Sequence, residues 1–377
     1  MEVSKARDFF PHTKTGTIYF NHAATGPLST FVTNKLNEYL KERSLEKIDN
    51  FPKVKDYVKS TKEDLGKYLN CSPDRIAYTD NTTNGINILA SGLNWSKGDR
   101  ILLNDIEFPA NVYPFLNLQK DGVIIDFVKS HDGIVSADDI ISNIRPDTKL
   151  VSISFVQFLT GYRADLEKIG DYCKEKGIIF CVDAIQGLGA LRLDVKKCNV
   201  DFLSCGTQKW MLGLQGFAFI YLTEDLQDKL QPKYAGWLSV ENAWDFLHYE
   251  LIPLKSAERF QYGTISHIGV FAFRGALDFF QSFRWEDIEK QTIEVASYLS
   301  NQLEETGIKT FLAGCSKGNL SGIVSFKHNE SQKVYDYLTS NQISCAVREG
   351  VIRLSPHFYN TFEECDKLVG ILKKYNR

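Results

Sequence analysis

The sequence lacks an excess of either charge, and it lacks an apolar run long enough to cross a membrane. Its 44 basic and 47 acidic residues leave a net charge of −3 over 377 residues, without a basic cluster. We therefore expect neither a nucleic-acid partner nor an anionic membrane partner. No apolar run approaches the roughly 18 residues of a transmembrane helix, and the opening residues do not resemble a signal peptide. A cytoplasmic location is the resulting expectation.

Clustered cysteines are missing as well. The eight cysteines are scattered, and no two of them have the short spacing of a zinc site. We therefore expect no metal site, and we expect a reducing compartment. The chain has no internal repeat, and no G-x-G-x-x-G motif stands between its first strand and helix patterns, which weighs against a nicotinamide-dependent dehydrogenase.

The most informative stretch runs from Gly177 to Tyr221 and contains three apolar runs typical of strands buried on both faces. Asp183 ends the first run, and Lys209 follows the second. Open α/β sheets bind ligands beyond the carboxyl ends of their strands, so the two side chains can meet in one crevice. An acid and an amine placed in this way suit pyridoxal phosphate (PLP), because the amine forms an imine with the aldehyde and the acid keeps the pyridine nitrogen protonated. Taken singly, the acid could be a turn residue and the amine a solvated charge.

This stretch resembles the class V aminotransferase group of fold-type I PLP enzymes, which includes cysteine desulfurases, selenocysteine lyases and isopenicillin-N-epimerase-like proteins. The resemblance is based on VDAIQ, on Lys209-Trp210 with the Gly-rich turn that follows, and on motifs along nearly the whole chain. It implies an α/β fold-type I PLP-transferase. A large, mostly parallel-sheet domain is expected at residues 18–256, and a smaller α+β C-terminal domain at 257–377, together with the N-terminal segment 1–17.

The resemblance also implies which residues hold the cofactor. Polar caps open a helix directly after a strand at 80–90, a pattern that suits a phosphate dianion. Phe108 stands where desulfurases usually have a stacking His, and Gln157 stands where family members bond the phenolic oxygen of the cofactor. The cofactor residues implied in this way are Thr82, Thr83, Phe108, Gln157, Asp183, Gln186, Gln208, Lys209 and Thr264.

Two of these residues carry further implications. Gln208 replaces a potentially charged His next to the Lys, so the helix terminus and its two threonines would carry more of the phosphate. Thr264 follows Gly263 in a segment that reaches the phosphate of the neighbouring subunit in the family. The resemblance therefore implies a homodimer to which Thr264 contributes in trans.

Three residues are implied on the substrate side. Arg353 lies in the C-terminal signature and would grip the substrate α-carboxylate with its bidentate fork, although a surface strand arginine is the alternative. Asn21 and His22 belong to a segment of small residues that lies at the mouth of the site in the family. A turn histidine without a ligand is an equal alternative for His22.

The reaction depends on what leaves the substrate. In the family, an enzyme that releases sulfur or selenium carries a thiol on a loop just before the carboxylate-binding Arg. Here only four residues separate Arg348 from Arg353, and Cys345 lies on the predicted strand ahead of them. We therefore expect a transaminase, lyase or epimerase that acts on an amino acid through a Lys209 Schiff base, ahead of a cysteine desulfurase or selenocysteine lyase. A cofactor-free scaffold or partner subunit of the same fold is the alternative of another class, and Asp183 and Lys209 weigh against it.

Helical periodicity predicts two helices between residues 31 and 69. It also predicts one long helical pattern that begins at Ile268 and continues to Leu303.

Overall fold

A seven-stranded sheet organises the larger part of the molecule, of which the computed structural model describes residues 3–375. From one edge to the other, its strands are β2 (Ile76–Thr79), β8 (Ala218–Leu222), β7 (Phe202–Gly206), β6 (Ile179–Asp183), β5 (Thr148–Ser154), β3 (Arg100–Asn104) and β4 (Ile124–Val128). Strand β8 runs in the direction opposite to that of the other six strands. The predicted α/β fold with a mostly parallel sheet is confirmed.

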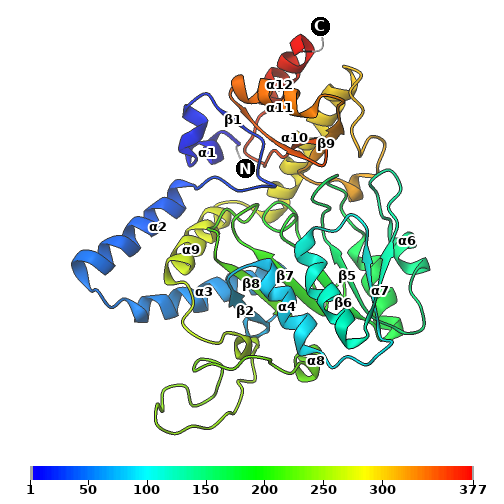
Figure 1. Ribbon diagram of the computed structural model, residues 1–377. Coiled ribbons are helices and arrows are strands. Elements are labelled where there is room, and N and C mark those ends of the chain that lie inside the picture. The colour runs from blue at the N-terminus through cyan, green and yellow to red at the C-terminus, as the bar shows by residue number, and fades with distance from the viewer. Residues whose placement is uncertain (1–2, 376–377) are drawn as a thin grey trace.

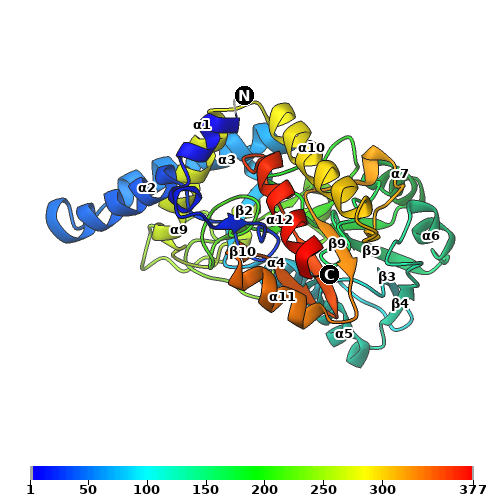
Figure 2. The same cartoon turned by 90° about the horizontal axis from the view of Figure 1, so that it is seen from above.

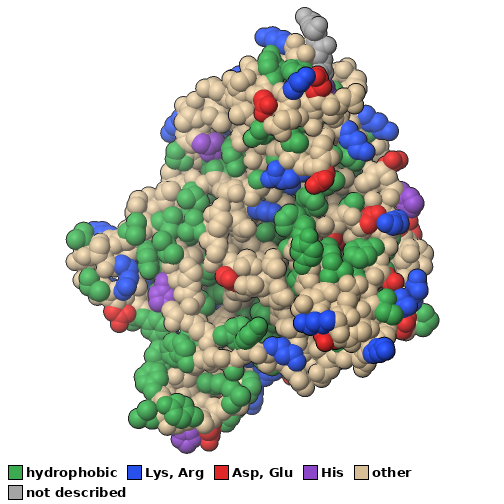
Figure 3. Space-filling model, in the orientation of Figure 1, with side chains coloured by type: hydrophobic (Ala, Val, Ile, Leu, Met, Phe, Trp, Pro, Cys, Tyr) green, Lys and Arg blue, Asp and Glu red, His purple; other side chains and the backbone are tan. Residues whose placement is uncertain are grey.

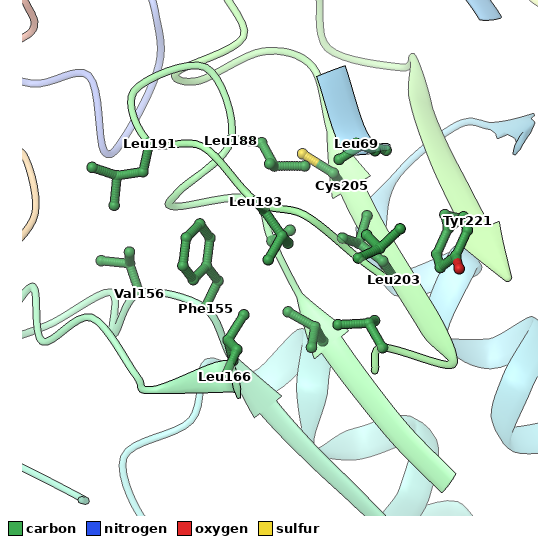
Figure 4. Packing of buried hydrophobic residues seen from close by; sticks show 14 of the residues in the cluster. Leu69, Phe155, Val156, Leu166, Leu188, Leu191, Leu193, Leu203, Cys205 and Tyr221 are labelled. Atoms are coloured by element: carbon green, nitrogen blue, oxygen red, sulfur yellow. The ribbon is translucent and has the colours of Figure 1, made fainter. Parts of the chain in front are cut away.

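Helices cover both faces of this sheet (Figure 1). In β6, Phe180 and Val182 face one hydrophobic core, and Ile179 and Cys181 face the other. This alternation explains why the strand reads as an uninterrupted apolar run. The first core also takes residues from α3 (Phe51–Leu69), α6 (Ala137–Ser142), α7 (Leu166–Lys176) and α9 (His267–Gln281), and part of it is drawn in Figure 4. The second core takes residues from α4 (Thr82–Gly92), α5 (Tyr113–Leu116) and α8 (Glu224–Lys229).

A smaller α+β part lies against the top of the sheet domain in Figure 1. Its antiparallel sheet has the order β11 (Ala346–Arg348), β12 (Val351–Leu354) and β9 (Val324–Lys327). One face of this sheet packs on α10 (Trp285–Glu304), α11 (Ser331–Ser340) and α12 (Phe362–Tyr375), which are seen from above in Figure 2. The N-terminal segment, with α1 (Val3–Asp8), joins this part because β1 (Ile18–Tyr19) pairs with β10 (Ile343–Ser344).

Two features project from the sheet domain. The helix α2 (Thr30–Lys41) and the start of α3 form an arm, and residues 231–256 form a long excursion below it (Figure 1). Within residues 3–375, no helix combines the length and the apolar character that a membrane crossing requires.

The structure modifies one expectation about helices. The two helices predicted between residues 31 and 69 are present as α2 and α3, but the long pattern from Ile268 is divided into α9 and α10. The chain turns at 282–284, where the Trp285 ring stacks on Tyr68 at 3.9 Å and on Phe280 at 4.8 Å. The domain boundary at 256/257 stays a prediction, and α9 packs on α2 and α3 rather than on the small sheet.

Candidate active site

The carboxyl ends of three neighbouring strands, β5, β6 and β7, lie side by side at one edge of the large sheet. Ser154 at the end of β5 lies opposite Asp183 at the end of β6, and Asp183 lies opposite Ser204 in β7. Lys209 follows β7 by three residues. The edge at which the sequence predicts a ligand site therefore carries both the acid and the amine.

Asp183 is a buried carboxylate, with 2% of its surface exposed. Its Oδ1 accepts a hydrogen bond from the backbone N–H of Ile185 at 3.0 Å. Burial raises the pKa of Asp183, the carboxylate of Glu107 raises it further, and Lys209 acts in the opposite direction. A buried acid of this kind favours a cationic partner, which a protonated pyridine nitrogen would supply.

The Lys209 amine is largely enclosed by the protein and is not a solvated surface charge. Burial lowers the pKa of Lys209, whereas Asp183 raises it and Arg353 lowers it again. Among residues 3–375 the amine forms no salt bridge, and its Nζ lies 5.6 Å from the centroid of the Phe108 ring. A lowered pKa makes the neutral, nucleophilic amine more available.

The segment of small residues near the N-terminus passes directly over the lysine. Gly26 donates its backbone N–H to the carbonyl of Gln208 at 2.7 Å, and a Cβ at Gly26 would meet the carbonyl oxygen of Lys209 at 2.2 Å. A side chain at this position cannot fit. The small residue at this position therefore allows the backbone to approach Lys209 itself.

The first turn of α4 reaches the same edge of the sheet. Asn81 caps the helix by accepting the N–H of Asn84 at 2.8 Å, and Gly85 allows α4 to approach Ser204 closely, because a Cβ there would lie 2.2 Å from Ser204 Oγ. The Thr82 hydroxyl accepts the N–H of Gly206 at 3.0 Å. Helix N-terminal N–H groups and the helix dipole at this turn suit an anion. The roles of Thr82 and Thr83 toward a phosphate stay predictions.

Gln208 lies half-buried on the same side of the site. A Cβ at Gly206 would lie 2.5 Å from Gln208 Oε1, so the side chain folds back over the end of β7. Gly206, which has no side chain, therefore leaves room for Gln208. Its predicted contact with a phosphate is not tested by these distances.

Arg353 lies on the face of the small sheet that is turned away from the α10 to α12 core. It is 2% exposed, and its Nη1 donates to the carbonyl of Phe158 at 2.7 Å. Burial lowers the pKa of Arg353 to about 10, and the charge of Arg348 lowers it in the same direction. A buried guanidinium of this kind, without a carboxylate partner among the described residues, suits an anionic ligand. Its position does not match the surface-arginine alternative.

His22 does not offer a free ring nitrogen to a substrate. It is fully buried, its Nδ1 donates to the carbonyl of Ser355 at 2.8 Å, and its Nε2 accepts the Tyr359 hydroxyl at 2.6 Å. Burial lowers the pKa of His22 well below its usual value, which agrees with this neutral tautomer. These contacts favour the alternative without a ligand.

Gln186 also has both ends of its amide engaged. Its Nε2 donates to the carbonyl of Ala23 at 3.0 Å, and its Oε1 accepts the indole N–H of Trp210 at 2.9 Å. The side chain therefore ties the N-terminal segment to the residue next to Lys209. This arrangement supports the lysine, and a cofactor contact of Gln186 stays a prediction.

Thr264 is exposed and lies outside this crevice. It lines a surface hollow together with Asn84, Tyr262 and residues near the start of α4. Thr264 does not line the crevice of its own chain. Its surface position is therefore compatible with the predicted role, in which it reaches the site of a second chain.

One buried carboxylate of the site was not given a role by the sequence. This carboxylate belongs to Glu107, which directly precedes Phe108 in the chain. It accepts hydrogen bonds from Asn104, Asn111, Ser154 and Gln157. The signal available in sequence was a glutamate next to the ring-stacking position, directly after a buried strand.

The site contains polar atoms that are buried and have no partner within the described chain. Four side-chain atoms meet this description, namely Asn21 Oδ1, Gln157 Oε1, Ser325 Oγ and Arg353 Nε. Ser325 lies directly opposite Arg353 in the small sheet. Buried polar atoms are normally paired, so these orphans indicate a place for a polar ligand. With a buried acid and an amine of lowered pKa, the residues fit PLP and an amino-acid substrate. No cluster of metal-ligating side chains occurs in the described part of the chain.

Comparisons with known proteins agree with this arrangement. The model of the family "Aminotransferase class-V" matches residues 18–368. The uncharacterized aminotransferase YcbU of Bacillus subtilis (strain 168) is 28% identical over 358 residues, which cover 95% of this chain and 94% of that protein. A probable cysteine desulfurase of Ureaplasma parvum serovar 3 is 29% identical over 399 residues, covering 98% and 97%.

Solved structures show the same fold. The apo cysteine desulfurase of Thermococcus onnurineus NA1 has a TM-score of 0.89 at 23% identity, covering 99% of this chain and 97% of that one. A mutant of C-DES with glycine covalently linked to the PLP cofactor has a TM-score of 0.86 at 24% identity, covering 97% and 98%. These structures establish the fold, and the family-model match over residues 18–368 establishes the family. The chain belongs to the class-V aminotransferase family of PLP-dependent enzymes.

Proposed function

We propose that this enzyme transforms an amino acid at its α-carbon, as a transaminase, lyase or epimerase, and that it does not pass sulfur through a thiol of its own. PLP supplies an electron-accepting ring when it is bound. Lys209 would hold the cofactor and then move the proton at the substrate α-carbon, Asp183 would hold the ring nitrogen protonated, and Arg353 would bind the substrate carboxylate.

The observation that carries this proposal is the position of the thiols. Cys345 is 3% exposed and lies in the hydrophobic core of the small domain, and burial raises its pKa to about 12. The turn between β11 and β12 consists of Glu349 and Gly350, both with positive φ, so it leaves no loop for a thiol. Cys205 lies close to Lys209 in sequence, but its sulfur points into the core (Figure 4).

The residue at position 108 narrows the choice among these reactions further. By the family resemblance, Phe108 stands where cysteine desulfurases usually have a His, and a phenyl ring cannot give or take a proton. An epimerase with two bases would need such a group opposite the lysine. Transamination and the elimination of a good leaving group need only one proton carrier, so we favour these two reactions. Cysteine desulfuration, which the names of several relatives suggest, remains the second candidate.

The test is product analysis with single L-amino acids. The purified holoenzyme would be incubated with each amino acid, with and without a 2-oxo acid as amino acceptor. Acceptor-dependent consumption would identify a transaminase, and acceptor-independent release of a 2-oxo acid and ammonia would identify a lyase. Protein-bound persulfide formed from L-cysteine would contradict the proposal.

Substitution of Cys345 tests directly whether its thiol takes part in the reaction. We expect Cys345→Ser to leave turnover within about twofold of wild type, because the thiol contacts the core rather than the substrate. The polar hydroxyl in an apolar core should instead lower the free energy of unfolding by about 1–3 kcal/mol. Turnover and thermal unfolding would be measured side by side. Loss of sulfide release in Cys345→Ser, but not in Cys365→Ser from the same core, would show that the thiol is catalytic.

We further propose a homodimer, located in the cytoplasm. The excursion 231–256 exposes large apolar side chains, which gather at the lower left of Figure 3. The exposed side chains of this patch are Tyr234, Trp237, Trp244, Phe246, Leu247, Tyr249, Leu251 and Ile252. An apolar patch of this extent is typical of an interaction surface. A cytoplasmic location would suit the eight free cysteines, which are all unpaired.

A second copy of the chain is the occupant that suits this patch, because the patch continues to Thr264. The rings of Tyr234 and Tyr262 lie 5.7 Å apart, and a Cβ at Gly236 would meet the carbonyl of Tyr262 at 1.6 Å. The excursion thus packs against the segment that contains Tyr262 and Thr264. A partner seated on the patch would bring its own Thr264 toward the first turn of α4.

Thr264→Ala tests this arrangement. A hydroxyl hydrogen bond to a charged group contributes about 1.5–3 kcal/mol, so PLP affinity should fall by about tenfold to a hundredfold. By linkage, the apo-protein should dimerise less tightly than the holo-protein. Cofactor titration and sedimentation across protein concentrations would measure both effects, with Thr264→Ser as the matched control. A monomeric holoenzyme with full cofactor occupancy would show that the site is not shared.

A further inference from the structure

Glu107 is a buried carboxylate at the centre of a hydrogen-bond network beneath the cofactor site. It is 7% exposed, and no Lys or Arg forms a salt bridge with it among residues 3–375. Its Oε1 accepts from Asn104 Nδ2 at 2.6 Å and from the backbone N–H of Ser154 at 2.8 Å. Its Oε2 accepts from Ser154 Oγ at 2.5 Å and from Asn111 Nδ2 at 3.2 Å. A fifth donor, Gln157 Nε2, approaches Oε1 at 3.2 Å.

The orientation of the Asn104 amide follows from a group that can only donate. The backbone N–H of Ile106 donates to one atom of this amide at 3.2 Å, so that atom is the oxygen, Oδ1. The other atom is then the nitrogen that donates to Glu107. Both neighbours of the Gln157 amide are therefore fixed as acceptors, namely Asn104 Oδ1 and Glu107 Oε1.

The Gln157 amide has only one orientation that satisfies these neighbours. Its Nε2 lies 3.2 Å from each of the two acceptors, so both of its hydrogens are used. The backbone of Gln157 is fixed as well, because its N–H donates to the carbonyl of Tyr162 and its carbonyl accepts the N–H of Gly161, both at 2.9 Å. The side chain can neither turn over nor shift without breaking this network.

The carbonyl oxygen of Gln157 is consequently the end that points away from Glu107. This Oε1 is buried and has no partner in the described chain, and the whole side chain is only 4% exposed. The next residue, Phe158, binds Arg353 through its carbonyl and contacts the Phe108 ring edge-on at 5.2 Å. The orphan oxygen therefore belongs to the wall between the ring-stacking position and the carboxylate-binding position.

We propose that Glu107 is a positioning residue that turns the carbonyl oxygen of Gln157 toward the cofactor, so that Gln157 accepts a hydrogen bond from the phenolic oxygen. Glu107 lies next to Phe108 and binds Ser154, the strand neighbour of Asp183. The Glu107 carboxylate thus binds Gln157 directly. It also fixes the segments that carry two other implied cofactor residues, Phe108 and Asp183. This inference rests on the proposed cofactor site and goes further, because it assigns an acceptor to the phenolic oxygen.

The sign of one spectroscopic shift tests the proposal. PLP held by Lys209 would carry a titratable proton at its phenolic oxygen, and the absorbance of the holoenzyme would change when that proton is lost. An acceptor beside the phenolic oxygen favours the protonated form, whereas a donor favours the deprotonated form. Gln157→Leu removes the acceptor at similar size, so we expect the midpoint of the absorbance titration to fall by about one pH unit.

Two variants of Glu107 separate positioning from charge. Glu107→Asp keeps the charge but withdraws the carboxylate from Gln157, and Glu107→Gln removes the charge at nearly the same size. If Glu107 acts by positioning, both variants should lower the midpoint, and both shifts should shrink when Gln157→Leu is already present. An effect of charge alone would leave Glu107→Asp at the wild-type midpoint. Thermal unfolding of the apo-proteins would show whether each variant folds.

The outcomes distinguish this inference from the proposed function. A rise in the midpoint of Gln157→Leu would identify Gln157 as a donor and overturn the inference, and an unchanged midpoint would also overturn it. Equal shifts of Glu107→Asp with and without Gln157 would overturn the positioning role. A protein that binds no PLP would show no titrating band, which would contradict the proposed function itself. Even if both Glu107 variants fail to fold, Gln157→Leu alone shows whether the midpoint falls or rises, and so whether Gln157 is an acceptor or a donor.

Discussion

Replacing Lys209 with alanine should leave a folded protein that has lost its turnover. Proton transfer by a positioned side chain contributes about 10²–10⁴-fold to rate, and the loss of the covalent anchor for the cofactor adds to this. The fold should survive, because burial opposes the charged form of this amine and alanine removes that cost. Turnover of the amino acid that the wild type consumes is the measurement, with circular dichroism as the check on folding.

A surface lysine provides the control for this variant. The Lys67 side chain is 81% exposed and lies only near Asp64, at 3.9 Å, so Lys67→Ala should retain wild-type turnover. Turnover of Lys209→Ala within tenfold of wild type would contradict the assignment of Lys209 as the proton carrier.

Replacing Asp183 should be almost as damaging, for a different reason. Without the carboxylate the ring nitrogen would lose its proton, and the cofactor would accept electrons poorly. Removing an electrostatic group aimed at developing charge typically costs about 10²–10³-fold in rate, and we expect Asp183→Asn to lose turnover in this range. Asp183→Ala should in addition bind PLP poorly, because it removes one member of a buried ion pair, which typically costs about 3–5 kcal/mol.

The apo-protein supplies an independent readout for Asp183. Its folded pKa is raised above the unfolded value, so the folded state binds the proton more tightly than the unfolded state. Stability from this group is therefore present at low pH and is lost as the pH rises through the folded pKa. Apo Asp183→Asn should thus be at least as stable as the wild type at alkaline pH. A less stable and fully active Asp183→Asn would show that the carboxylate has a structural role instead.

The features that sequence could predict are those set by local pattern and by strand order. Apolar runs that end at Asp183 and before Lys209 predict parallel strands, and parallel strands end at one edge. The cap at Asn81 marked the start of α4 in the same way. These predictions needed no knowledge of side chains across the sheet.

The remaining features depend on contacts between distant residues. The break between α9 and α10 has neither Gly nor Pro, and it results from the packing of Trp285 on Tyr68. The neutral, enclosed state of His22 depends on Tyr359, more than 330 residues away in the chain. The direction of the Gln157 amide depends on Glu107 and Asn104, which a local pattern cannot orient. Sequence thus predicted that Asp183 and Lys209 follow strands that end at one edge of the sheet, but not which atoms of the neighbouring side chains are free.

The central claim is that Lys209 holds the cofactor covalently. Borohydride reduction of the purified holoenzyme, followed by proteolysis and mass spectrometry, tests this claim most directly, because reduction makes the link between amine and cofactor permanent. We predict that the reduced cofactor is found on the peptide that contains Lys209, and that Lys209→Ala yields no labelled peptide. Finding the cofactor on any other lysine would contradict the account.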